Sequence, residues 1–331
     1  MTRIPVWLDT QWQRLQDGVR DGRLGHAILL TGPQGVGKSI LAAELKKLVL
    51  CAEHKVPACG HCRSCQVAAA GNHPDVHILE VLEDKTAILV EQVRELVEAL
   101  TYTPTYASHK IALIRPAEKM NQNSFNALLK TLEEPPGDTL LVLLSHSASK
   151  LPATIISRCQ AVHCGVPNAA VAAKWLNEQT GEGDWEVSLE LAGGAPFQAI
   201  DYKKQGVNKL FASIIEDLLG LNDGSSDLVA VAQEWNRAHL ALRLVSLYKL
   251  LRLLTLHKCG LEGELAHKSG FSSLHKVARD IKLSTLLGYQ HKVVLTIAGL
   301  DSQLNSELML DDLLAPWVHG FNNYQLETLE R

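Results

Sequence analysis

The segment from Gly32 to Ser39 reads GPQGVGKS and constrains the fold of this chain more than any other stretch. It matches the pattern G-x-x-x-x-G-K-[ST], follows an apolar run at residues 27–31 and precedes residues of helical composition at 40–45. A strand, a glycine-rich turn and a helix in this order are the context in which the pattern forms a phosphate-binding loop. The glycines let successive backbone N–H groups face an anion, and the helix N-terminus adds partial positive charge.

We therefore predict a nucleotide site, with ATP or ADP and Mg²⁺ as its ligands. Lys38 is expected to contact the β- and γ-phosphates, and Ser39 is expected to hold the magnesium ion. The alternative explanation is a glycine-rich turn that carries a surface lysine. Because the backbone of the whole loop takes part, the predicted cofactor-binding residues are Gly32, Pro33, Gln34, Gly35, Val36, Gly37, Lys38 and Ser39.

Composition and charge limit how the chain can act on nucleic acid. Its 331 residues predict two or three domains, and 46% hydrophobic residues allow a substantial core. The formal net charge is −4, and no long run of lysine and arginine is present. A protein that grips nucleic acid by itself usually has a basic surface. Any role on DNA is therefore expected to be exercised inside an assembly.

Neither the N-terminus nor the longest apolar segment has the pattern of a targeting or membrane signal. The N-terminal residues 1–12 lack a long apolar core, so a signal peptide is not expected. The longest apolar segment, residues 240–256, is interrupted by Arg243, Lys249 and Arg252, which favours a buried bundle helix over a membrane span. We predict a soluble, cytoplasmic protein with no membrane partner.

Four of the seven cysteines lie close together in the segment CAEHKVPACGHCRSC. Two overlapping C-x-x-C units, preceded by a further cysteine within reach, are typical of a tetrahedral zinc site with four thiolate ligands. Four thiolates close the coordination sphere, so the zinc is expected to be structural and not catalytic. The predicted metal ligands are Cys51, Cys59, Cys62 and Cys65.

Three alternatives to this zinc site stay open from the sequence. Disulfides are disfavoured in a cytoplasmic chain. A redox C-x-x-C normally opens a helix beside a strand, whereas this cluster lies among proline, glycine and histidine residues. Either His54 or His61 could replace one cysteine ligand.

The apolar run at residues 110–114 is typical of a buried parallel strand. In a P-loop ATPase this strand should end in acids that anchor magnesium and polarise water. Here it is followed by Arg115 and Pro116, and Glu118 lies three residues past Arg115, beyond a proline that bends the chain. We therefore predict that the second half of the hydrolysis machinery is absent.

Periodicity predicts the elements around these motifs. A short amphipathic helix is expected near the N-terminus, and apolar residues at helical spacing predict a helix over 88–100. Further strands are expected at 76–81 and 140–145. Residues 123–134 read as a helix that ends at a double proline.

Two motifs carry a resemblance to a known family. SFNALLKTLEEPP at 124–136, followed by LPATIISRC at 151–159, resembles the clamp-loader branch of the AAA+ ATPases. The cysteine module after the first helix resembles one shared by bacterial γ/τ and δ′ subunits. The degenerate acid motif, the segment GNHPD at 71–75 and the C-terminal segment 304–314 are similar to the δ′ subunits of DNA polymerase III. The resemblance covers nearly the whole chain, most specifically residues 24–160.

This resemblance implies three domains. They would be an AAA+ P-loop α/β domain with an inserted zinc module over residues 1–165, a small helical lid over 166–206, and an all-helical collar domain for oligomerisation over 207–331. The apolar stripe from Leu210 to Leu219 fits the helical character of the third domain. In ATP-hydrolysing relatives the lid carries a sensor arginine, whereas residues 191–199 contain none.

The resemblance also implies a mechanism and partners. The Ser-Arg-Cys motif would make Arg158 an arginine finger that acts on the nucleotide of a neighbouring subunit, for which a permanently charged, planar guanidinium is suited. From the residue alone, a surface arginine that caps a helix or pairs with a carboxylate is favoured over an arginine finger. The implied partners are γ/τ and δ subunits, with the sliding clamp and primer-template DNA engaged through the assembly at the replisome. The chain would be a part of the polymerase holoenzyme that does not itself polymerise.

Competing functions differ from this expectation in testable ways. An ATP-hydrolysing γ/τ motor is disfavoured by the missing acids after Ile114 and by the missing lid arginine. A zinc-finger DNA-binding module is disfavoured by the acidic net charge and by the lack of aromatic residues between basic ones in the cluster. An unrelated P-loop kinase is disfavoured because no acceptor-site residues are evident.

Overall fold

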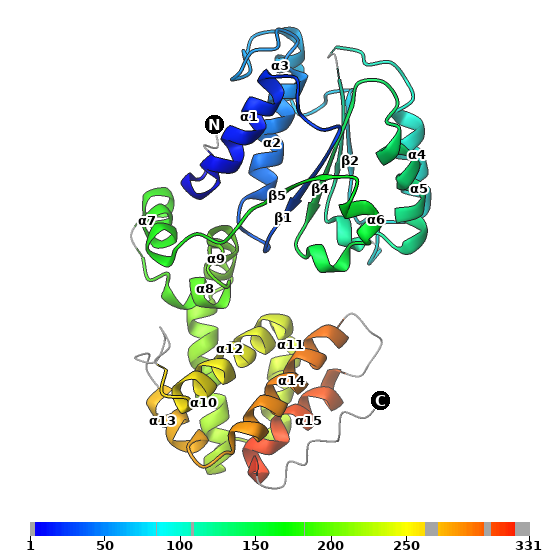
Figure 1. The fold of residues 1–331 in the computed structure, drawn as a ribbon. Helices are drawn as coiled ribbons and strands as arrows, with labels where there is room; N and C mark the ends of the chain where they lie inside the picture. Colours follow the sequence, from blue (N-terminus) through cyan, green and yellow to red (C-terminus); the bar gives the residue numbers. More distant parts are fainter. Residues whose placement is uncertain are drawn as a thin grey trace. The chain divides into compact units, whose positions relative to one another are not determined.

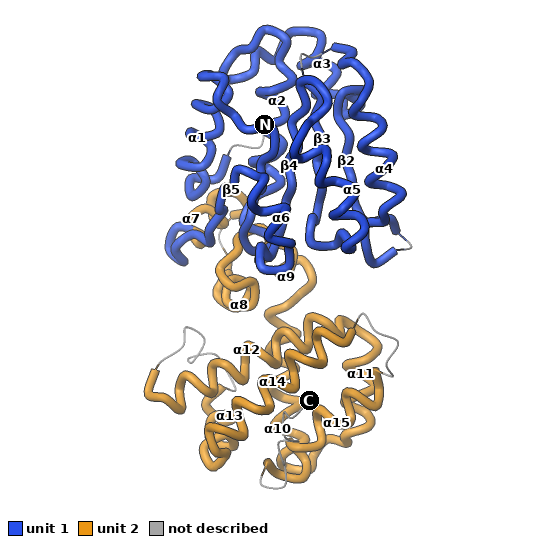
Figure 2. Tube along the Cα trace, turned by 45° about the vertical axis from the view of Figure 1, so that its right-hand side comes forward, with its two compact units in different colours: residues 1–171 blue, residues 172–331 orange. Residues whose placement is uncertain are grey.

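The computed structural model describes residues 4–83, 85–106, 109–181, 183–261, 271–300 and 306–321. The chain forms two compact units, residues 1–171 and residues 172–331 (Figure 2). The three-domain division at residues 165 and 206 stays a prediction. Of the C-terminal segment 304–314 that contributes to the family resemblance, residues 304 and 305 lie outside the described residues.

A parallel five-stranded sheet of order β2-β3-β4-β1-β5 forms the centre of the first unit. Every residue of β1, β3 and β4 is buried, which explains why these segments are continuous apolar runs and not alternating ones. The predicted parallel α/β class and these strands are confirmed. The strands are β1 (Ala27–Thr31), β2 (Val76–Leu79), β3 (Lys110–Ile114), β4 (Thr139–Ser145) and β5 (Gln160–His163).

Helices cover both faces of this sheet (Figure 1). On one face, apolar residues of α4 and α5 share a core with alternate residues of β1, β3 and β4, whereas α1 and α2 lie on the other face. The predicted helices near the N-terminus, at 88–100 and at 123–134 are confirmed. The helices and 3₁₀ turns are η1 (Val6–Leu8), α1 (Asp9–Arg20), α2 (Lys38–Leu50), α3 (Arg63–Ala69), α4 (Val90–Ala99), η2 (Ala117–Lys119), α5 (Gln122–Glu133), η3 (Ala148–Lys150) and α6 (Ala153–Ile156).

The described part of the second unit is helical. A small core of Ala172, Leu176, Trp185, Leu189 and Ala199 joins α7, α8 and α9. A much larger core joins the longer helices that follow residue 206. The helices are α7 (Ala169–Thr180), α8 (Glu186–Leu191), α9 (Pro196–Lys204), α10 (Val207–Asp223), α11 (Leu228–Arg237), α12 (Leu240–Lys258), α13 (Phe271–Ala278), α14 (Leu283–Gly299) and α15 (Ser306–His319).

Helix α12 is the apolar segment that the sequence assigned to a bundle. Its leucines are buried on several sides, and Arg243 within it is buried against carboxylates of neighbouring helices, with Nη1 3.5 Å from Asp217 and Nη2 3.2 Å from Glu234. None of the helices in the described ranges is both long and apolar enough to cross a membrane.

Candidate nucleotide and metal sites

The phosphate loop, residues 32–39, follows β1 and runs into the first two residues of α2, as the motif requires. Gly37 has a φ of 102° and caps α2, and Gly32 has a φ of 140°, which is a backbone region that L side chains rarely adopt. A Cβ at Gly32 would lie 2.0 Å from the carbonyl oxygen of Cys164, the residue after β5. The loop is thus shaped by a contact with a segment more than a hundred residues away.

Lys38 is folded into the loop. Its Nζ donates to the carbonyl oxygens of Gly32 at 2.5 Å and Pro33 at 2.7 Å, and the residue is only 3% exposed. Burial lowers the pKa of Lys38 to about 8, while Cys164 and Glu118 act in the opposite direction. The ammonium group therefore stays mostly protonated at neutral pH, held by carbonyl oxygens that a phosphate would replace.

The end of β3 carries a surface ion pair where an ATPase carries its acids. Arg115 pairs through Nε with the Oε1 of Glu80, and both side chains are solvent-accessible. The next carboxylate, Glu118, lies on η2, and its Oε1 accepts a hydrogen bond from the backbone N–H of His146 at 2.9 Å. Because His146 directly follows β4, Glu118 lies at the same edge of the sheet as the phosphate loop.

Arg158 lies at the opposite end of the strands. It precedes β5, whose first residue Gln160 pairs with Ile28 near the start of β1, whereas the phosphate loop begins after Thr31. At about 3.3 Å per residue, Gly32 lies roughly 13 Å further along the strand direction than Ile28. The arginine and the loop of the same chain are therefore separated by the length of β1.

The Arg158 side chain is partly exposed and held by α5. Its Nε donates to Glu133 Oε1 at 2.7 Å, its Nη1 donates to the carbonyl oxygen of Thr154 at 3.0 Å, and 34% of the side chain is accessible. Glu133 belongs to the motif SFNALLKTLEEPP. The two motifs that carry the family resemblance thus meet in one ion pair.

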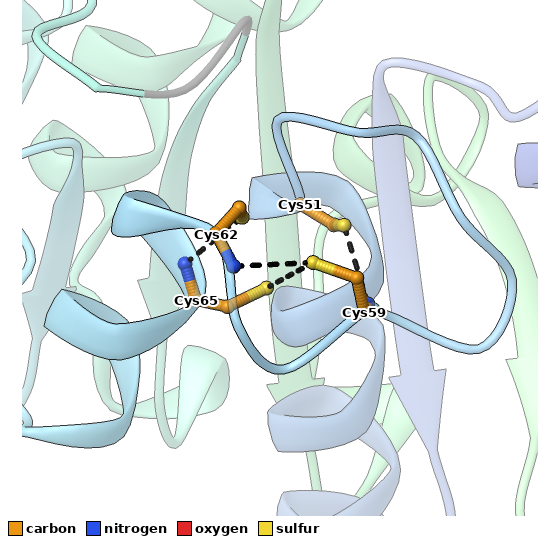
Figure 3. Close-up of side chains that lie close together, drawn as sticks. All are labelled: Cys51, Cys59, Cys62 and Cys65. Atoms are coloured by element: carbon orange, nitrogen blue, oxygen red, sulfur yellow. Dashed lines mark hydrogen bonds between the residues drawn. The ribbon is translucent and has the colours of Figure 1, made fainter.

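The four predicted zinc ligands come together. Cys51 follows α2, Cys59 and Cys62 lie in the loop, and Cys65 lies on α3; the sulfur atoms of Cys51, Cys59 and Cys65 are turned toward one another in Figure 3. All four Sγ atoms lie within 4.8 Å of each other. A tetrahedral site with Zn–S bonds of about 2.3 Å needs sulfur atoms about 3.8 Å apart, and Cys59 and Cys65 are separated by 3.9 Å.

The electrostatics of this cluster fit a bound cation. Burial opposes ionisation of Cys62, but N–H groups of Cys65 and Ala52 outweigh it and lower the pKa of this thiol to about 6. Burial and the neighbouring sulfur atoms raise the pKa of Cys65 to about 12. Four thiolates this close together would repel one another strongly, so a divalent cation is needed to ionise all four.

The alternatives for the cysteines have different outcomes. All seven cysteines lie within the described ranges, and each is a free thiol. His61 lies near Cys59 and Glu53 in a second, more exposed group, whereas His54 belongs to neither candidate metal group within those ranges. Although the cluster lies among proline, glycine and histidine residues, the second C-x-x-C opens a helix: Cys62 caps α3, and its Sγ accepts from the N–H of Cys65 at 3.4 Å.

A buried polar network lies behind the cysteine module. Ser64 Oγ donates to the carbonyl oxygen of Leu50 at 2.5 Å and lies 2.9 Å from His73 Nε2, and His73 Nδ1 accepts from the N–H of Asp75 at 3.2 Å. The Asp75 carboxylate accepts the N–H groups of Thr105 and Tyr106. Ser64, His73 and Asp75 are 1%, 5% and 3% exposed. This burial excludes a hydrolytic triad, because no substrate could reach the serine.

Sequence reasoning predicted the loop, the cysteines and Arg158, but it missed the residues that support them. Glu133 lies in a motif of the family resemblance, but nothing in the sequence pairs it with Arg158; Ser64 and His146 carry no sequence signal, because each acts through a contact with a segment distant in sequence. Residues 71–75, GNHPD, carry a resemblance to a family. A serine next to one of the clustered cysteines, followed by this His-Pro-Asp segment, is the sequence feature that hints at the buried network.

Comparisons with known proteins identify the family of this chain. Residues 7–167 match the family described as DNA polymerase III, delta subunit. The DNA polymerase III subunit delta' of Pseudomonas aeruginosa is 39% identical over 246 residues, which span 73% of this chain and 74% of the relative. The corresponding subunit of Escherichia coli is 29% identical over 329 residues, or 95% of each chain.

A relative of another subunit type matches a shorter segment. The DNA polymerase III subunit tau/gamma of Haemophilus influenzae is 40% identical over 151 residues, which cover 45% of this chain but only 21% of that protein. The match to the delta' subunit of Pseudomonas aeruginosa extends over about three quarters of both chains. This chain belongs to the DNA polymerase III subunit delta' family.

Proposed function

We propose that the chain is the non-motor δ′-type subunit of a bacterial clamp loader, where it donates Arg158 to the nucleotide site of a neighbouring γ/τ subunit. The observation that carries this proposal is the position of the arginine. Arg158 is partly exposed, and it lies at the end of β5 away from the chain's own phosphate loop. A guanidinium at that end of the strands suits a site on another subunit better than the site of its own chain.

The chemistry of a donated arginine is specific. When a γ-phosphoryl group is transferred to water, negative charge develops on its oxygens, and a planar cation that offers several N–H donors stabilises that charge. Arg158 already places Nε and Nη2 on one carboxylate oxygen and Nη1 on a carbonyl oxygen. The same donors would serve phosphate oxygens when a neighbour's nucleotide replaces Glu133.

The chain's own nucleotide site is proposed to bind ATP or ADP with Mg²⁺ and to hydrolyse ATP slowly or not at all. Residues 32–39 keep the loop geometry, and Lys38 supplies the cation. The strand end carries Arg115 and Pro116 in place of acids, and residues 191–199 of the proposed lid contain no arginine. Binding and turnover use different groups, so one can persist without the other.

The cysteine module is proposed to hold a structural zinc ion. Four sulfur atoms fill a tetrahedral coordination sphere and leave no position for water or substrate. The ion would fasten the end of α2 to the start of α3. Its contribution is to the stability of the first unit and not to chemistry on a substrate.

The remaining parts of the proposal concern assembly. The P-loop domain at 1–165, the lid at 166–206 and the collar at 207–331 would place the chain in a ring with δ and γ/τ subunits in the bacterial cytoplasm. The sliding clamp and primed DNA would be reached through that ring. This agrees with the formal net charge of −4, because a net negative charge does not attract the chain to DNA phosphates.

The test is ATP turnover by the assembly reconstituted from this chain and its γ/τ and δ partners. Arg158→Ala should slow hydrolysis at the adjoining γ/τ site by about 10³-fold or more, as is typical of arginine fingers. Arg115→Ala is the matched control, because Arg115 is also a surface arginine paired with a glutamate. Equal turnover with both variants would contradict the arginine-finger role.

A second candidate function is an ATP-hydrolysing motor subunit of the γ/τ type. It is favoured by the intact phosphate loop and by the similarity of a 151-residue segment of the chain to a tau/gamma subunit. Turnover by the isolated chain separates the two candidates. An inert chain supports the δ′-type role, whereas robust turnover that is lost in Lys38→Ala would favour the motor.

A further inference from the structure

Glu118 is an acid at the phosphate-loop end of the sheet, and its carboxylate is only partly hydrogen-bonded. Its Oε1 accepts the backbone N–H of His146, but its Oε2 is buried and has no hydrogen-bond partner among the described residues. A buried carboxylate oxygen without a partner costs free energy, and such an atom usually marks a missing ion or water. Something positively charged or hydrogen-bonding is therefore expected beside it.

The route of the chain explains how Glu118 reaches this position. After β3 the backbone passes Pro116 and enters η2, where Ala117 is fully buried in the core beneath the sheet edge. Glu118 is thereby set against the first residue beyond β4, which is the strand between β3 and β1. The carboxylate therefore lies closer to the phosphate loop than an acid at the end of β3 itself would lie.

The electrostatic surroundings connect Glu118 with the loop lysine. Glu118 interacts with the Lys38 ammonium group, and both groups interact with the imidazole of His146. Lys38, Ser39 and Glu118 therefore converge on the same edge of a parallel sheet, outside the carboxyl ends of β1, β3 and β4. Ligands of open α/β sheets bind at this edge.

We propose that Glu118 supplies the carboxylate that binds the magnesium ion of a nucleotide held in the phosphate loop. Mg²⁺ in proteins keeps several waters and takes one or two carboxylates together with phosphate oxygens. Ser39, exposed at the start of α2, and Glu118, whose Oε2 is buried without a hydrogen-bond partner, provide such a set with the phosphates. This inference rests on the proposed nucleotide site and specifies the acid that the strand end lacks.

The same geometry allows an opposite role, which the test must separate. Glu118 could act only as a counter-ion that neutralises Lys38 when no phosphate is present. In that case it would repel the nucleotide, and its removal would tighten binding whether or not magnesium is present. A magnesium ligand has the reverse effect, and only when the metal is present.

The experiment measures equilibrium binding of a fluorescent ADP analogue to the full chain, in Mg²⁺ and in EDTA. Glu118→Gln should weaken binding in Mg²⁺ by about tenfold or more and leave binding in EDTA unchanged, since loss of a carboxylate that orients a metal typically costs 10–100-fold. Glu118→Asp, which keeps the charge on a shorter side chain, should retain part of the Mg²⁺ effect. Glu80→Gln, at the exposed end of the neighbouring strand, should match the parent.

Each other outcome has a definite meaning. Unchanged binding by Glu118→Gln in Mg²⁺, or tighter binding in both buffers, would overturn the proposal. If the parent and Lys38→Ala both fail to bind, the chain's own nucleotide site fails and Glu118 loses this role. The donation of Arg158 to a neighbour is untouched by that result, because it is measured on the nucleotide of the other subunit.

Discussion

The cysteine module and the phosphate-loop edge of the sheet differ in how complete they are. The cysteine module draws its four clustered thiols from residues 51–65 and is backed by the buried Ser64, His73 and Asp75. The phosphate-loop edge draws on residues 32–39, 118, 146 and 164, which converge only in the folded sheet. One site is closed and local, whereas the other is open and assembled from distant segments. The closed site should govern stability and the open site should govern ligand binding.

The largest expected effect comes from breaking the closed site. Cys65→Ser, or removal of metal by a chelator, should abolish bound zinc and lower the free energy of unfolding by several kcal/mol, because structural zinc sites contribute on the order of 10 kcal/mol. Zinc content and thermal denaturation measure this. Cys259→Ser, an exposed cysteine outside the candidate group, should change neither. A zinc-free parent with the same melting temperature would contradict the prediction.

A smaller effect is expected from the network behind the module. Ser64→Ala removes the hydroxyl between Leu50 and His73 and leaves the imidazole Nε2 buried without this partner, which should cost about 1–3 kcal/mol. Urea denaturation measures the loss, and zinc should be retained because the four cysteines are intact. Ser213→Ala is the control, since Ser213 makes one hydrogen bond within its own helix. An equal loss of stability in the two variants would contradict the prediction that the buried network stabilises the first unit.

The same network predicts a pH dependence of stability. Burial lowers the pKa of His73, with Lys46 acting in the same direction and Asp75 against it. Below about pH 6.5 the His73 imidazole binds a proton in the unfolded chain but not in the folded chain, whose pKa at this residue is lower. The free energy of unfolding should therefore fall as pH drops from about 6.5 toward the lower folded pKa. One such group contributes at most about 1.4 kcal/mol per pH unit.

Comparison of the parent with His73→Gln isolates this contribution. The half-buried His77 and the exposed His146 also have lowered pKa values and change stability in the same direction, and both remain in the variant. Urea denaturation between pH 7.5 and 5.5 should therefore show a shallower loss in the variant. Identical slopes would mean that His73 accepts its proton as readily in the folded chain as in the unfolded one.

The same contrast explains how much could be predicted from the sequence. The strands β1, β3 and β4 were evident because strands buried on both faces are continuous apolar runs, whereas β5, with exposed Gln160, Ala161 and His163, carries no such signal. The cysteine cluster could be predicted because the spacing of its residues is typical of a zinc site. The position of Glu118 could not be predicted, because the local sequence does not show where the chain runs after Pro116. The contact with His146 shows that position.

Position in the fold also limits what a motif can reveal. SRC at 157–159 and EEPP at 133–136 each resembled a family motif, but the ion pair between Arg158 and Glu133 depends on α5 and α6 lying together. The distance of Arg158 from its own loop follows from the register of β5 on β1, which no local pattern encodes. Contacts between residues far apart in sequence are therefore the part that required the structure.

The smallest effect on stability is expected where the open site meets solvent. Glu133→Gln removes the charge that holds Arg158, but both side chains are at least one third exposed, so the free energy of unfolding should change by less than about 1 kcal/mol. The effect on the assembly should be modest as well, within several-fold of parental ATP turnover, because the guanidinium remains. Arg158→Ala must then be far more damaging than Glu133→Gln, even though each breaks the same ion pair. If the two variants slow ATP turnover equally, turnover depends on the ion pair and not on donation of the guanidinium. Arg158 would then be a structural residue of the α5–α6 contact.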